Sequence, residues 1–170
     1  MFGLFKKKTA PEKLIDSLGP HYTQVVSLVN AMNGPFVNHY EAGIFVAAVA
    51  TSKILTFQKV DPPSFANEFN NLWVNYLVGS CSVDGARPSK DDVWTRLQEK
   101  FPIYREIFCD TIDQNLKEKA SVTRLCLMSE LYRNCTGKQK QEGGGKFLHL
   151  TDASVQLVAI GLSIIKEVHE

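Results

Sequence analysis

The sequence lacks an excess of charge of either sign. Its 19 Lys and Arg residues balance 18 Asp and Glu residues among 170, which leaves a net charge of +1 with neutral His. Proteins dedicated to nucleic acid usually carry a strongly basic face, so the charge balance argues against nucleic-acid binding. The chain is 44% hydrophobic, which is too apolar for a disordered protein, and at this length one domain is the default.

Long apolar runs are also missing. The longest candidate, residues 42–50, is shorter than the roughly 18 residues that a membrane-spanning helix needs. The N-terminus places three lysines after a very short apolar stretch, which is the reverse of a secretory signal. The sequence therefore predicts a cytoplasmic protein. Its four cysteines are expected to be free thiols, because none forms a C-x-x-C pair and no export signal is present.

No familiar arrangement of catalytic or metal-binding residues occurs. His39 and Glu41 are two residues apart and would point in different directions on a helix, whereas helical metal ligands recur at i and i+3 or i+4. We interpret His39 as a helix-start residue and Glu41 as a surface side chain. Lys146 follows three glycines, but the Ser or Thr of a phosphate-binding loop is absent. The sequence predicts no metal and no cofactor.

Apolar residues recur with the helical period, and no run alternates as a half-buried β-strand would. Gly19 and Pro20 predict the end of a short first helix, and Pro102 predicts a break or kink in a later one. The final helix is expected to begin near Thr151. The sequence therefore predicts an all-α fold, a single-domain irregular or orthogonal bundle of seven to eight helices.

Two helices are expected at the centre of this bundle, because residues 42–50 and 155–165 are apolar almost all round. A further helix starts at Asp61-Pro62, since proline fits the first turn of a helix. This helix carries four aromatic residues on one face, Trp73 among them. Aromatic side chains bury large areas, so the sequence predicts that this face anchors the core.

Residues 103–135 contain no Gly or Pro, and they could form one long helix or a helical hairpin. The apolar face rotates by roughly 160° between the two halves, which favours a break near residues 117–121. Arg124 follows that break and falls within the apolar arc of the second half. A charge there must be paired, reach water or bind an anion. We favour a buried ion pair with a carboxylate, and an anion site is the alternative.

Two polar stripes are candidates for an interaction surface. One consists of asparagines opposite the aromatic face of their helix, although Asn is a mediocre helix former. The other is acidic and lies almost opposite the apolar face of its helix. Plain solvent exposure would produce both stripes as well. Their members are Asn67, Asn71, Asn75, Glu106, Asp110 and Asp113.

The N-terminal segment, residues 1–9, is expected to be flexible and to precede a helical domain over residues 10–170. Its apolar and basic side chains could contact an anionic membrane surface. These side chains are Phe2, Leu4, Phe5, Lys6, Lys7 and Lys8. The apolar part is short, so a frayed segment, or one docked on its own domain, is the favoured interpretation.

The sequence as a whole favours a non-enzymatic cytosolic module that binds another protein. One alternative is a helical protein that binds a small ligand or lipid, with Arg124 as an anion contact. A second alternative is an enzyme whose site is assembled only in space. The partner and the oligomeric state stay open at this stage.

Overall fold

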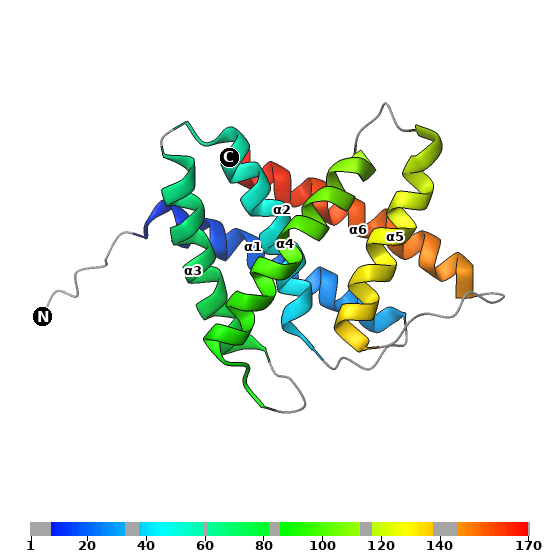
Figure 1. Ribbon diagram of the computed structural model, residues 1–170, viewed down its shortest axis with the longest axis horizontal. Helices are drawn as coiled ribbons and strands as arrows, with labels where there is room; N and C mark the ends of the chain where they lie inside the picture. Colours follow the sequence, from blue (N-terminus) through cyan, green and yellow to red (C-terminus); the bar gives the residue numbers. More distant parts are fainter. Residues whose placement is uncertain are drawn as a thin grey trace, which may run out of the picture.

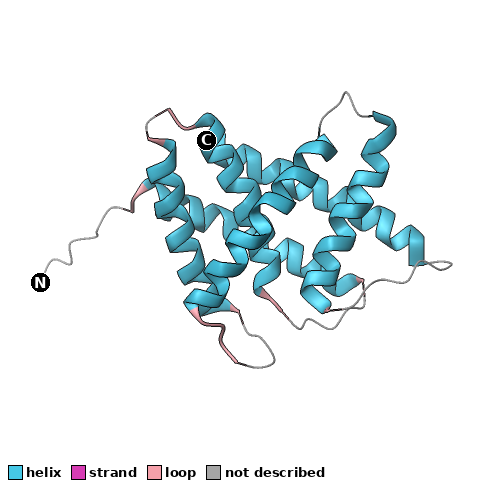
Figure 2. Cartoon of the chain, in the orientation of Figure 1, coloured by secondary structure: helices cyan, strands magenta, loops and turns pink. Residues whose placement is uncertain are grey.

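A computed structural model of the protein describes residues 8–32, 38–59, 61–81, 86–112, 117–137 and 146–169, with backbone only for 110, 111, 117–125 and 146–149. These residues form six α-helices and no β-strand (Figure 2). The helices are α1 (Ala10–Ala31), α2 (Tyr40–Phe57), α3 (Pro62–Ser80), α4 (Lys90–Ile112), α5 (Lys117–Thr136) and α6 (Lys146–His169). The all-α prediction is confirmed.

The described part of the chain has six helices instead of the predicted seven to eight, because two prolines stand inside helices. Pro20 lies within α1 and Pro102 within α4. A proline in a helix removes one hydrogen bond to the carbonyl four residues earlier. Those carbonyls belong to Asp16 and Gln98, which are both exposed residues. Water can therefore replace the lost donor, and neither helix has to end.

The central helix is α2, as predicted for residues 42–50. Residues 40–52 are all buried, and α2 contacts each of the other five helices. Figure 1 shows it crossing the middle of the bundle between α4 and the more distant α1 and α6. By length and composition α2 could also cross a membrane, yet 78% of it is buried inside the protein. A core helix meets that criterion equally well, so it is weak evidence for a membrane protein.

The position of α6 differs from the prediction that residues 155–165 are central. Val155 and Leu162 are 48% and 50% exposed, and only the opposite side of the helix packs against α1, α2 and α5. An apolar residue need not be buried, because apolar atoms contribute more than half of a typical protein surface. The helix also begins at Lys146, earlier than the predicted start near Thr151.

Residues 103–135 belong to a helical hairpin. Helix α4 ends at Ile112, α5 begins at Lys117, and the two helices pack against each other (Figure 1). The predicted break near residues 117–121 is therefore too late in the chain, because α5 already covers these residues. The rotation of the apolar face identified the hairpin because the two helices present different faces to the same core.

Capping residues fix two of the helix starts that the sequence predicts. Asp61 Oδ1 accepts a hydrogen bond from the backbone N–H of Ser64 at 3.2 Å, at the start of α3. Ser89 Oγ accepts one from the N–H of Asp92 at 3.0 Å, and its hydroxyl donates to the Asp92 carboxylate at 2.6 Å. These side chains satisfy N–H groups that have no partner within the helix.

Trp73 anchors α3 on α2, which confirms the predicted burial of this residue. Its side chain is fully buried, and its Nε1–H donates to the carbonyl oxygen of Gly43 at 2.9 Å. The ring stacks with those of Phe69 and Tyr76 at centroid distances of 6.0 and 5.1 Å. The indole therefore contributes both apolar burial and a satisfied hydrogen bond to the core.

Close approach of α6 to α4 depends on Gly161, where an added Cβ would meet the ring of the buried Phe108. We expect Gly161→Ala to destabilise the fold by up to about 2 kcal/mol, because overpacking costs about 1–3 kcal/mol and alanine regains about 1 as a helix former. Urea unfolding measures the change. The matched control is Gly79→Ala in α3, where nothing lies within 4 Å of the new Cβ. That variant should be as stable as the wild type or more so, and equal effects at both sites would contradict the explanation.

Candidate functional site

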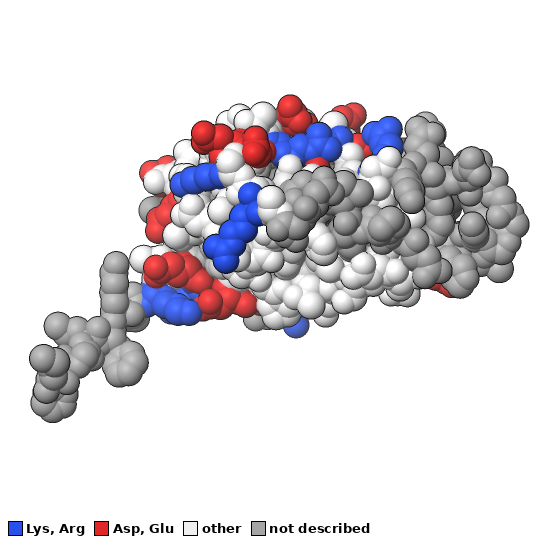
Figure 3. All heavy atoms as spheres, turned by 90° about the horizontal axis from the view of Figure 1, so that it is seen from below, with Lys and Arg blue, Asp and Glu red and all other residues white. Residues whose placement is uncertain are grey.

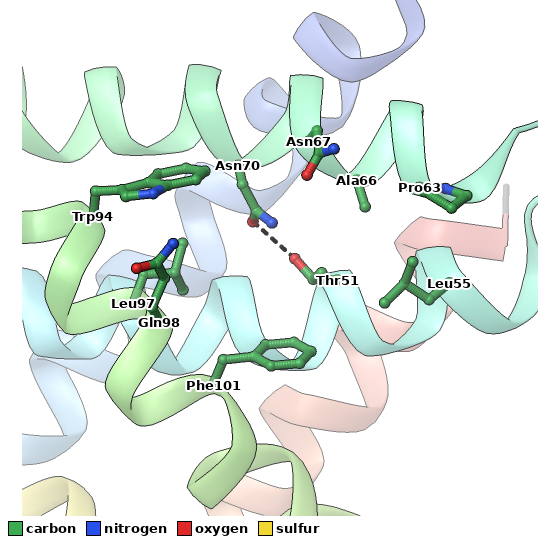
Figure 4. Close-up of a pocket in the computed structure, with 10 residues that line it drawn as sticks. All are labelled: Thr51, Leu55, Pro63, Ala66, Asn67, Asn70, Trp94, Leu97, Gln98 and Phe101. Atoms are coloured by element: carbon green, nitrogen blue, oxygen red, sulfur yellow. Dashed lines mark hydrogen bonds between the residues drawn. The ribbon is translucent and has the colours of Figure 1, made fainter.

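The candidate binding site is a groove of about 350 Å³ between α2, α3 and α4. Figure 4 shows side chains of α3 along one side and of α4 along the other, with Thr51 and Leu55 of α2 between them. None of the ten labelled lining residues carries a charge. The groove is therefore suited to an uncharged occupant, since a buried charge would have no counter-charge there.

Aromatic and aliphatic side chains form most of the groove surface. Trp94 and Phe101 are seven residues apart on α4 and so project from the same side of the helix. Both are only partly buried, and Leu55 at the end of α2 is 45% exposed. The buried Ala66 and Leu97 close the space beneath them. The result is an apolar surface that is open to a partner.

Amide side chains add a few polar contacts to this apolar surface. Thr51 Oγ1 donates to Asn70 Oδ1 at 2.8 Å, which ties α2 to α3 across the groove (Figure 4). Asn67 on α3 and Gln98 on α4 are exposed and line opposite sides. Each free amide offers donors and an acceptor. A peptide group, with one donor and one acceptor, matches such amides.

The predicted asparagine stripe is exposed, but only Asn67 lines the groove. Asn71 Nδ2 donates to the carbonyl oxygen of Asn67 at 3.0 Å, and Asn75 lies further along α3. Glu106 is exposed on α4 and is not among the lining residues of the groove. The structure therefore does not bring the two polar stripes together into one described site.

Three other predictions fall outside the part of the chain that the structure describes. The side chains of Asp110 and Arg124 are not described, and neither is any part of Asp113. The same holds for residues 1–7 of the N-terminal segment. The ion pair of Arg124, the acidic stripe and the contact with a membrane surface therefore stay predictions.

The sequence did not reveal a polar network between α2, α4 and α5. The interpretation of Glu41 as a surface residue is wrong, because its side chain is completely buried. Arg96 on α4 donates from Nε to Glu41 Oε1 and from Nη2 to Asn134 Oδ1 at 3.3 Å. The first turn of α2 faces α4, and a position in sequence alone cannot show that orientation.

A second part of the network connects α4 to α5. Lys100 Nζ donates to Glu130 Oε1 at 2.8 Å, and Asn134 Nδ2 donates to Tyr104 Oη at 2.9 Å. Lys100 is only 8% exposed. The helical period could have predicted the burial of Lys100, because Lys100 lies on the same helical stripe as the buried Leu97 and Tyr104. These contacts hold three helices in register and present no described polar group to the groove.

Burial raises the pKa of the Glu41 carboxyl, although the hydrogen bond and charge of Arg96 act in the opposite direction. Its second oxygen, Oε2, is buried without a hydrogen-bond partner among the described residues. The charge of Lys100 also favours the ionised form of Glu41, but only Arg96 donates a hydrogen bond to this buried carboxylate, so the ionised form depends most on Arg96. Glu41 and Arg96 therefore form the most sensitive pair in the network.

The pKa of Glu130 is shifted the other way. Burial opposes its ionisation, but hydrogen bonds from Lys100 and Asn134 and the charge of Arg133 together lower the pKa below the ordinary value of 4.5. A carboxyl with a lowered pKa stabilises the fold at pH values above its unfolded-state pKa, and this contribution is lost as the pH falls through its folded-state pKa.

We expect Glu130→Gln to be less stable than the wild type at pH 7 and the difference to shrink below about pH 4.5. Thermal melts of both proteins across this range measure it, and a difference independent of pH would contradict the shift.

No histidine or cysteine is among the lining residues of the groove. The His21 ring lies 3.8 Å from a Glu167 oxygen, but neither residue lines the groove. All four cysteines are free, and burial raises the pKa of the Cys81 and Cys135 thiols. A raised pKa keeps a thiol protonated and unreactive. Within the same residues, no cluster of three or more His, Cys, Asp or Glu side chains could hold a metal ion.

Charged side chains of both signs are interspersed on the face that Figure 3 shows, and a broad area of that face carries none. A surface of mixed charge gives no strong field for steering a polyanion. No family model, no curated protein and no solved structure matches this chain. Its function must therefore be argued from the groove itself.

Proposed function

We propose that the protein is a non-enzymatic interaction module that binds an uncharged, apolar segment of a partner polypeptide in the groove between α2, α3 and α4. The observation that carries this proposal is a partly exposed apolar surface with no charged lining residue. Aromatic side chains such as Trp94 are favoured anchors of binding, because they bury a large area with little loss of side-chain freedom.

A polypeptide suits the groove better than a small molecule does. The groove is open along α3 and α4, and the exposed amides of Asn67 and Gln98 flank its apolar surface. Such amides can pair with the backbone of an extended or helical segment while Trp94 and Phe101 receive its side chains. A charged residue at the centre of the segment would lose its hydration without gaining a partner.

The experiment is a selection of displayed random peptides on the immobilised protein, followed by affinity measurements with synthetic copies. We expect the selected peptides to have aromatic or aliphatic anchors and no charge at their centre. Leu55→Asp should weaken their binding at least about tenfold, or roughly 1.4 kcal/mol, because it places a charge at the groove. Ile103→Asp is the matched control, since Ile103 is also an exposed apolar residue but does not line the groove.

Peptides that bind Leu55→Asp as tightly as the wild type would refute the groove as their site. The absence of any selected peptide would refute the proposal as a whole. Stabilisation of the wild type by decanol, but by none of the peptides, would instead favour the small-ligand alternative. The volume of about 350 Å³ lies at the small end of the range for such ligands.

A further inference from the structure

A second surface, which shares no residue with the groove, is formed by the exposed side of α6. Exposed positions recur along this helix at alternating steps of three and four residues, from Asp152 through Ala159 to Lys166. Such a 3.5-residue period produces a stripe that turns by only about 20° every seven residues, which suits packing against another helix. Val155 and Leu162, the most exposed of the large apolar side chains, lie on this stripe.

Part of the stripe also lines a groove. A groove of about 550 Å³ runs between α1 and α6, and none of its lining residues is charged. Small side chains contribute to it from both helices: Ser27 and Ala31 from α1, and Ala159 and Ser163 from α6. Small residues allow two helix axes to approach closely, and Ala159 stands at the middle of the stripe.

We propose that this stripe packs against α6 of a second copy of the chain, antiparallel, around a two-fold axis at Ala159. In that arrangement a residue seven positions before Ala159 lies opposite the residue seven positions after it. Asp152 is then opposite Lys166 of the second copy. Val155 and Leu162 of the second copy then lie on one edge of the seam, and Gln156 and Ser163 lie on the other, with the members of each pair one residue, or about 1.5 Å, apart along the helix axis.

Every pair in this arrangement is chemically matched. The two large apolar side chains meet each other, a side-chain amide meets a hydroxyl, and an acid meets a base. The two-fold axis makes each pair occur twice, as a symmetric dimer requires. A parallel arrangement would instead place Asp152 against Asp152 and Lys166 against Lys166. Pairs of opposite charge on a surface add little affinity, but the repulsion between like charges disfavours the parallel arrangement.

The matched polar residues also distinguish a second copy from other occupants. A lipid surface would have to desolvate Gln156 and Ser163 without hydrogen bonds, whereas a second α6 supplies both partners. A seam of one helix from each copy is at the small end of protein interfaces, so we expect a dissociation constant in the micromolar range. The proposed peptide groove is not part of this surface.

Sedimentation equilibrium of the full chain, from low to high micromolar concentration, tests the dimer. We expect the wild type to dimerise and Leu162→Glu to raise the dissociation constant at least about tenfold. The matched control is Ile103→Glu, which places the same charge on an exposed apolar site of α4 and should dimerise as the wild type does. Circular dichroism establishes that both variants are folded. A monomer at all concentrations, or a dimer that Leu162→Glu leaves unchanged, would overturn the proposal.

A cysteine pair tests the register and the orientation. In a Cys126→Ser background, which removes an exposed thiol, Ala159→Cys should form a disulfide-linked dimer under mild oxidation, because its two copies meet at the axis. Ser163→Cys should not, since its copies are about 12 Å apart along the helix axis, too far for a disulfide. Equal cross-linking at both positions would overturn the register.

Charge reversal gives an independent test of the same register. Asp152→Lys should weaken the dimer, because it faces Lys166 of the second copy. The double variant Asp152→Lys with Lys166→Asp should restore the affinity. Restoration supports the antiparallel pairing, and a double variant as weak as the single one would overturn it.

Discussion

Replacement of Arg96 by Met is expected to destabilise the fold by about 3–5 kcal/mol, the usual cost of removing one partner of a buried ion pair. Glu41 is completely buried, and Arg96 supplies its hydrogen bond and its counter-charge. Methionine retains most of the apolar stem but removes both. Urea unfolding at neutral pH measures the loss of free energy.

Replacement of the other partner, Glu41→Leu, should cost less, because the Arg96 side chain is 30% exposed and also contacts Glu99. In Glu41→Leu the guanidinium can turn to water, and the combination of Glu41→Leu with Arg96→Met should recover much of the lost stability. Arg96→Met and Glu41→Leu with equal costs, or a double variant as unstable as Arg96→Met, would contradict the explanation.

The pH dependence of Arg96→Met follows from the raised pKa of Glu41. A raised pKa means that the folded state holds the proton more tightly than the unfolded state, so stability falls as the pH rises through the folded-state value. Loss of Arg96 raises this pKa further. The deficit of Arg96→Met relative to the wild type should therefore shrink as the pH is lowered from neutral towards the ordinary carboxyl value of 4.5.

Truncation of Trp73 to alanine is expected to cost about 3–5 kcal/mol, the range for a core aromatic residue. The indole is fully buried between α2 and α3 and loses its stacking partners and its hydrogen bond to Gly43 together. Urea melts followed by circular dichroism measure the change, because the substitution removes one of the two fluorescent indoles.

Two variants separate the contributions to this loss. Trp73→Phe retains an aromatic ring but has no N–H donor, so it should cost less than Trp73→Ala. Trp94→Ala truncates the other indole, which is only partly buried at the groove, and should also cost less. A loss below about 1 kcal/mol for Trp73→Ala would be typical of an exposed position and would contradict the packing of α3 on α2.

Several features of the fold could be predicted from the sequence because they depend on neighbouring residues. The period of apolar residues predicted helices, Asp61 and Ser89 marked two helix starts, and the rotated apolar face marked the hairpin of α4 and α5. The peptide N–H groups at a helix start find their caps within three residues, so the signal is complete in a short window.

The same local rules failed where the surroundings decide the outcome. Pro20 does not end α1, and of the break or kink predicted at Pro102 the break does not occur, because each freed carbonyl lies on an exposed part of its helix. Apolar residues predicted a central position for both α2 and α6, yet half of the Leu162 side chain is exposed. A single helix shows which of its faces are apolar, but the number and placement of its neighbours determine how many are covered.

The groove and the buried network depend on tertiary structure alone. Glu41 finds Arg96 fifty-five residues later in the chain, and Lys100 finds Glu130 thirty residues later. The groove combines Leu55, Trp94 and Phe101 from two helices with Asn67 from a third. The sequence determined which helices form and which side chains each can offer. The packing of α2 against α3 and α4 decided which of them meet, because an ion pair or a groove requires several distant segments to be fixed in space at once.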